Sequence, residues 1–81
     1  MGTLRVMSRH GDDRVQWDTE RLQEGDREAV AAVQEAERIF AEQRAKGATA
    51  FKVTQGQVAV RIDTFDREAE QIMMVPRVAG G

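Results

Sequence analysis

The chain has 81 residues, of which 32% are charged, a formal net charge of −2 and no cysteine. This length corresponds to one small domain, and the absence of cysteine excludes disulfide bonds, thiolate metal sites and a cysteine nucleophile. Interspersed acidic and basic residues argue against a dedicated nucleic-acid-binding protein. No apolar run approaches a membrane span, and the N-terminus lacks the apolar core of a signal peptide. We therefore expect a cytoplasmic protein without a membrane or nucleic-acid partner.

The N-terminal part of the chain predicts a β-hairpin. Residues 3–8 and 14–18 each alternate between apolar and polar side chains, which is the period of a half-buried strand. The polar residues 9–13 between them include a glycine and are typical of a turn. Two alternating runs around such a turn form a hairpin.

A long amphipathic helix is predicted over residues 27–46, which contain neither glycine nor proline. Residues 19–25 are polar apart from Leu22 and indicate a connection, after which Asp26 offers a carboxylate as the helix N-cap. Gly47 fits the left-handed residue that commonly follows a helix. Four apolar residues recur at helical spacing and form the predicted core face: Ala29, Val33, Ala36 and Phe40.

The second half of the chain predicts another hairpin and a last strand. Residues 50–53 and 58–62 are short β-rich runs on either side of a turn. The second run places three apolar side chains on one face: Val58, Val60 and Ile62. Asp66 is positioned to cap a short helical turn that extends to Glu70, with Ala69 turned inward. Residues 72–75 then form the final strand.

These elements predict an α+β domain in which one amphipathic helix covers one face of a mixed sheet. The order is ββαββ followed by a final short strand. We expect residues 1–75 to form the folded body and residues 76–81 to form an extended, flexible tail that ends in two glycines.

The tail carries a family resemblance. The run Val75-Pro76-Arg77-Val78-Ala79-Gly80-Gly81 resembles the C-terminal tail of ubiquitin and ubiquitin-like modifiers, and the predicted element order resembles their β-grasp fold. The resemblance implies that an ATP-dependent activating enzyme adenylates the Gly81 carboxylate. A conjugating enzyme then passes the acyl group to a target protein, and a JAB-type or other peptidase removes it.

The same resemblance assigns roles to residues near the tail. Gly80 and Gly81 form the conjugation tail, because a Cβ at either position would block a narrow enzyme tunnel. Partner enzymes would contact residues at the end of the last strand and beyond it: Met74, Val75, Arg77 and Val78. The modifier itself would have no catalytic residue, metal or cofactor. Lys46 and Lys52 are the only lysines that could accept a second copy.

Other functions remain open at this stage. A sulfur carrier would share the fold and tail, and its Gly81 carboxylate would become a thiocarboxylate. A small structural or interaction module, for instance a phage or assembly-associated protein, would bind a partner through a sheet edge or the long helix. In that case Gly80 and Gly81 would be incidental.

Residues that suggest catalysis or stacking have simpler interpretations. His10 lies in the predicted turn beside Asp12 and Asp13, where a solvated side chain is expected, and no Ser/His/Asp set, phosphate loop or metal-spaced cluster is present. Met73 and Met74 are compatible with the core or with a docking patch near the tail. The aromatic residues are more typical of core packing than of a base-stacking platform: Trp17, Phe40, Phe51 and Phe65.

Overall fold

The computed structural model describes residues 1–8 and 11–77, without the side chains of Ser8 and Asp12. The predictions for His10, Val78, Gly80 and Gly81 therefore lie outside the described residues. The described chain forms two helices, α1 (Thr19–Gln23) and α2 (Arg27–Ala45). It also forms five strands: β1 (Gly2–Ser8), β2 (Gly11–Trp17), β3 (Thr49–Val53), β4 (Val60–Ile62) and β5 (Gln71–Val75).

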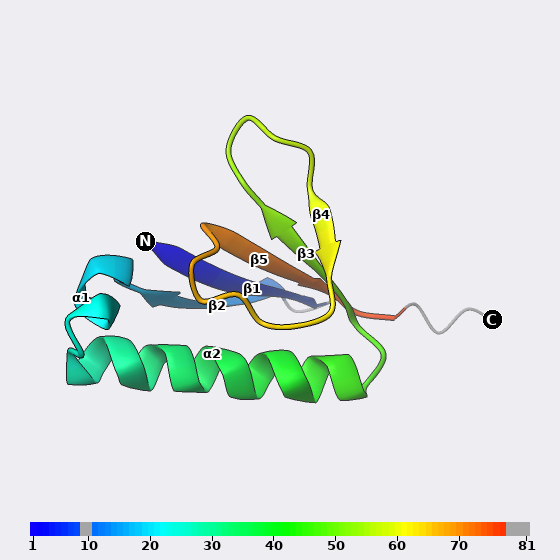
Figure 1. The fold of residues 1–81 in the computed structure, drawn as a ribbon. Helices are drawn as coiled ribbons and strands as arrows, with labels where there is room; N and C mark the ends of the chain where they lie inside the picture. Colours follow the sequence, from blue (N-terminus) through cyan, green and yellow to red (C-terminus); the bar gives the residue numbers. More distant parts are fainter. Residues whose placement is uncertain (9–10, 78–81) are drawn as a thin grey trace.

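The strands form one mixed sheet in the order β2-β1-β5-β3-β4. The two hairpins, β1–β2 and β3–β4, are antiparallel. The last strand, β5, enters between them, parallel to β1 and antiparallel to β3. Helix α2 runs along one face of the sheet, as Figure 1 shows. This small α+β architecture, with a five-stranded mixed sheet and one long helix, is broadly consistent with a β-grasp-like fold.

The core lies between α2 and the sheet face that it covers. The predicted helix face is confirmed, because Ala29, Val33, Ala36 and Phe40 are all buried. They pack against alternate residues of the inner strands, since successive side chains of a strand point to opposite faces. The fully buried side chains that this alternation contributes are Leu4, Ile72, Met74 and Ala50.

Asp26 and Gly47 define the two ends of α2, as the sequence predicts. Oδ1 of Asp26 accepts hydrogen bonds from the main-chain amides of Glu28 and Ala29, at 3.0 and 3.1 Å. These bonds satisfy two of the amides that a helix start leaves unpaired. At the other end, Gly47 has φ +95°, a left-handed conformation that L side chains rarely adopt. The helix therefore begins and ends where local chemistry dictates.

Three local predictions are corrected. The connection expected over residues 19–25 contains the helix α1, which begins because Asp18 accepts hydrogen bonds from two amides of its first turn. Strand β2 begins already at Gly11, inside the expected turn. Residues 67–68 form a turn rather than a helical turn that extends to Glu70, although Asp66 accepts from the Glu68 amide as a cap and Ala69 is buried, both as expected. Short elements such as these depend on a single cap or on tertiary contacts that the sequence pattern does not display.

The second hairpin also differs from its prediction. Strand β4 covers only Val60–Ile62 rather than residues 58–62. Val58 is 86% exposed and Val60 is 58% exposed, although their alternation predicts an inward face. The reason is that β4 lies at the edge of the sheet, beyond the part that α2 covers (Figure 1). Val58 and Val60 do lie on one face, as their alternation predicts, but little of the protein covers that face at β4.

Candidate functional site at the end of β5

The candidate site begins where the chain leaves the centre of the sheet. The last pair of the β3–β5 ladder is Thr49 with Val75, and Pro76 and Arg77 continue outside the strand, both exposed. Proline has no N–H to donate to a ladder, which explains why the strand ends at this position. Strand β5 therefore ends at Val75, and the diglycine lies outside the described residues.

Arg77 packs over the end of the long helix. A Cβ built on Gly47 would lie 3.2 Å from Cδ of Arg77, so the arginine stem covers the glycine that follows α2. The C-terminal end of a helix carries partial negative charge, which favours a cation there. Gly47 thus has two roles, a left-handed turn and close contact with the root of the tail. The arginine remains exposed and accessible to a partner.

Met74 does not belong to this surface. Its side chain is 0% exposed and lies in the core, because its position in β5 points toward α2. The expected partner contact from Met74 is therefore wrong for the folded state. Val75 is half-buried and points to the opposite face, together with Met73. Of the predicted contact residues, Val75 and Arg77 remain available, and Val78 lies outside the described residues.

The uncovered face of the sheet carries a row that crosses all five strands. Arg5 lies opposite Arg14 on one side and beside Met73 on the other. Phe51 lies between Met73 and Arg61. This row sets a half-buried aromatic and a methionine between cationic residues, on the face to which Val75 also points. This row was not predicted, because Phe51 was expected to pack in the core. The pattern that indicates its position on the open face is its alternation with buried Ala50.

Charged contacts hold the crossover between β4 and β5, residues 63–70, in place. Nζ of Lys52 lies 2.8 Å from Oδ2 of Asp66, and the Glu68 amide donates to Oδ1 at 2.9 Å. The hydrogen bond from Lys52, followed by that amide, lowers the pKa of the Asp66 carboxyl. The same pair raises the pKa of the Lys52 ammonium. The two lysines thus differ in exposure. Lys52 is paired with Asp66 and partly covered, whereas Lys46 at the end of α2 has a more exposed side chain.

Two kinds of feature are not found among the described residues. No group of three or more metal-ligating side chains lies together in the described ranges 1–8 and 11–77. The same ranges contain no helix that is long and apolar enough to cross a membrane. The features that define the candidate site are the exposed Arg77 and the half-buried Val75 at the end of β5.

Comparisons with protein-family models, curated proteins and solved structures return no match to this chain. The resemblance to ubiquitin-like modifiers therefore depends on the tail motif and on the order of the elements. It stays a prediction.

Proposed function

We propose that this chain is a ubiquitin-like protein modifier, activated at the Gly81 carboxylate and conjugated to a target protein. The observation that supports the proposal best is the position of β5. This strand pairs with β1 on one side and β3 on the other, and it ends at Val75. Residues 76–81 thus follow a strand that is held on both sides, and they can enter an enzyme while the body remains folded.

The chemistry requires little from the body. The Gly81 carboxylate attacks the α-phosphate of ATP, forms an acyl-adenylate and releases pyrophosphate. An enzyme nucleophile then attacks the acyl carbon and releases AMP, after which an amine of the target forms an isopeptide bond and frees the enzyme. In this proposal the modifier supplies the acyl group, and its partner enzymes supply the catalytic side chains.

Arg77 and the row on the open sheet face would position the body on the activating enzyme. The guanidinium of Arg77 is a natural contact for an acidic groove near the active site. Met73 and Val75 lie on the same face and would supply apolar contacts beside it. A JAB-type or other peptidase would contact the same root of the tail when it releases the target.

Pyrophosphate–ATP exchange tests the first step. The purified chain ending at Gly81 is incubated with ATP, labelled pyrophosphate and each adenylating enzyme purified from the producing cell. We expect exchange that depends on the chain and disappears when Gly81 is deleted, without a fall in melting temperature. Arg77→Glu should weaken the exchange, whereas Glu24→Gln should not, because Glu24 is an exposed residue that follows α1, and α1 lies away from the end of β5 (Figure 1). Exchange that persists without Gly81 contradicts the proposal.

Intact mass distinguishes the sulfur carrier. A modifier purified from the producing cell should carry a carboxylate at Gly81, or should be attached to another protein. A carrier should instead be recovered partly with sulfur in place of one carboxylate oxygen. A thiocarboxylate form, together with the absence of conjugates, would replace conjugation by sulfur transfer as the function.

A further inference from the structure

The outer edge of β4 is open. β4 is last in the sheet order and pairs only with β3, so its second row of main-chain groups has no strand partner within the described ranges. Such rows are templates for another strand, and proteins commonly protect them with charges or proline. β4 is short and carries one charged residue, Arg61, whereas residues 53–60 before it contain neither a charge nor a proline. Val58 and Val60 are instead 86% and 58% exposed.

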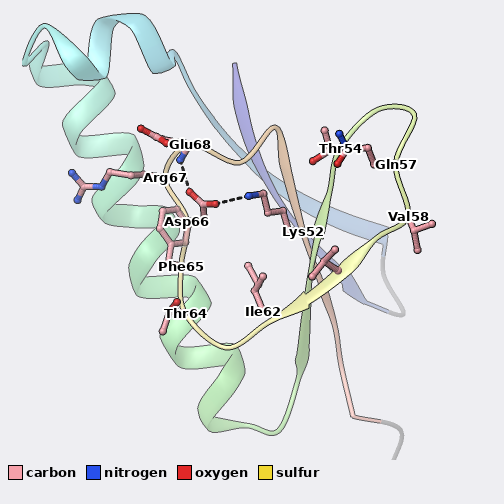
Figure 2. A pocket seen from close by; sticks show the side chains of 11 residues that line it. Lys52, Thr54, Gln57, Val58, Ile62, Thr64, Phe65, Asp66, Arg67 and Glu68 are labelled. Atoms are coloured by element: carbon pink, nitrogen blue, oxygen red, sulfur yellow. Dashed lines mark hydrogen bonds and ion pairs between the residues drawn. The ribbon is translucent and has the colours of Figure 1, made fainter.

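A hollow of about 540 Å³ lies beside this edge. Figure 2 shows it between the β3–β4 hairpin and the crossover, with Ile62 and Phe65 on facing walls. Arg61 is not among the lining residues, which agrees with the alternation of side chains along a strand. The apolar part of the lining combines alternate residues of the edge with one ring of the crossover: Val58, Val60, Ile62 and Phe65.

The far wall of the hollow is held in position by charged contacts. Lys52 crosses to Asp66 at 2.8 Å, drawn as a dashed line in Figure 2. The guanidinium of Arg67 reaches Glu37 of α2 at 2.9 Å. The wall is therefore tied both to β3 and to the helix. A ligand that docks here does not have to order it, which reduces the entropic cost of binding.

Arg61 defines the chemistry on the other face of the edge. It is exposed, lies opposite Phe51 in the ladder and makes no ion pair with any residue in the described part of the chain. A strand added to β4 would place alternate side chains over the hollow and the others beside Arg61. Aliphatic side chains suit the hollow, and a carboxylate suits the position beside a guanidinium.

We propose that the β4 edge binds an extended peptide segment of a partner protein, in which aliphatic residues alternate with acidic residues. A second copy of this chain fits less well. Antiparallel pairing of two β4 strands centred on Arg61 would set two guanidinium groups opposite each other, which destabilises a ladder. The site uses no residue of the diglycine tail, and it shares only Arg61 with the row on the open sheet face.

Fluorescence anisotropy with a labelled peptide tests this site. The probe is a capped peptide in which valine alternates with glutamate, and the full chain is the titrant. We expect saturable binding with a dissociation constant below about 1 mM. Two control probes should bind at least about tenfold more weakly. In one of them lysine replaces glutamate, and in the other a central proline removes a ladder donor.

Charge reversal provides the sharper comparison. Arg61→Glu should weaken binding of the valine–glutamate peptide at least about tenfold and should create binding of the valine–lysine peptide. Val60→Lys should weaken the first interaction as well. Met7→Lys is the matched control, because Met7 is an exposed strand residue (44%) that does not line the hollow. It should bind like the unmodified chain, as should a chain that lacks Gly81.

Amide hydrogen exchange on the unmodified chain provides a test that does not depend on the folding of any variant. In the unmodified chain, the peptide should slow amide exchange within residues 58–62 and leave β2, the opposite edge, unchanged. Three results would overturn the proposal. They are no saturable binding by the unmodified chain, peptide affinity that Arg61→Glu leaves unchanged, and self-association through this edge that Val60→Lys abolishes.

Discussion

The indole nitrogen of Trp17 donates a hydrogen bond to the main-chain oxygen of Arg67, 3.0 Å away and 50 residues later in the chain. The ring of the same tryptophan lies 5.5 Å from that of Phe65, centroid to centroid. Trp17 thus joins the first hairpin to the crossover that carries the wall of the hollow. Its 2% exposure shows that this junction is part of the core.

The space beside Trp17 predicts the effect of a single methyl group. Gly2 lies opposite Trp17 in the β1–β2 ladder, and a Cβ at Gly2 would overlap the indole ring. Gly2→Ala should therefore displace the ring and lower the free energy of unfolding by about 1–3 kcal/mol. Urea denaturation followed by tryptophan fluorescence measures the change. Thr3→Ala, in the next position of the same strand, is the control and should cost less than about 1 kcal/mol.

Phe40 tests the core between α2 and the sheet. Its ring is 5% exposed and meets the ring of Phe65 edge-on, with centroids 5.7 Å apart. Phe40→Ala should lower the free energy of unfolding by about 3–5 kcal/mol, because it removes a buried aromatic side chain and leaves a cavity. Gln34→Ala on the exposed face of the same helix should have little effect. A loss below about 1 kcal/mol for Phe40→Ala would contradict the assigned core face.

The Lys52–Asp66 pair predicts a dependence of stability on pH. The pKa of Asp66 is lowered in the folded state, so the carboxylate stabilises the fold above its unfolded pKa. That contribution is lost as pH falls through the folded value. Both side chains are partly exposed, so Asp66→Asn should cost less than about 1 kcal/mol at neutral pH. The difference from the unmodified chain should begin to shrink near the unfolded pKa of about 4 and should vanish only below the folded pKa, which is lower.

A double-mutant cycle separates this pair from other charges. Lys52→Gln and Asp66→Asn, combined, should cost less than the sum of the two single changes, because both remove one interaction. Urea denaturation across the acidic range measures all four proteins. A difference between Asp66→Asn and the unmodified chain that stays constant down to low pH would contradict the assignment.

The two neighbouring methionines of β5 should differ in oxidation. Met73 is half-buried on the open face, whereas Met74 is 0% exposed in the core. Limited treatment with hydrogen peroxide should therefore convert Met73 to the sulfoxide before Met74, and the exposed Met1 and Met7 should react earliest. Peptide fragmentation by mass spectrometry locates each added oxygen. Equal rates for Met73 and Met74 would show that β5 opens during the reaction.

Regular elements were predictable from the sequence because their signals are local. The face of α2 that includes Val33 and Phe40 follows from helical spacing, and its limits follow from Asp26 and Gly47. The alternating runs likewise predicted three of the five strands closely, whereas β2 begins three residues before its predicted start. Only β4 was overestimated, since alternation indicates which residues share a face without indicating whether another layer covers it.

The candidate site was predictable only in part. The exposed Arg77 after the last strand follows from Pro76, which must end the ladder. Contacts between distant segments, such as Lys52 with Asp66, have no local signature and appear only when the crossover is placed. The same applies to the partition of Met73 and Met74, because either face of β5 could have been the inner one from the sequence alone.

The central claim is that Gly81 becomes joined to other proteins, and tryptic peptide mapping in the producing cell tests it most directly. Trypsin cleaves after Arg77, so a conjugated lysine keeps a branch of Val78, Ala79, Gly80 and Gly81. We expect such branches on target lysines in cells that contain the chain, and none in cells whose chain lacks Gly81. Conjugates are expected to disappear while the truncated protein stays folded. No branched peptide in cells that produce the intact chain abundantly would contradict the account.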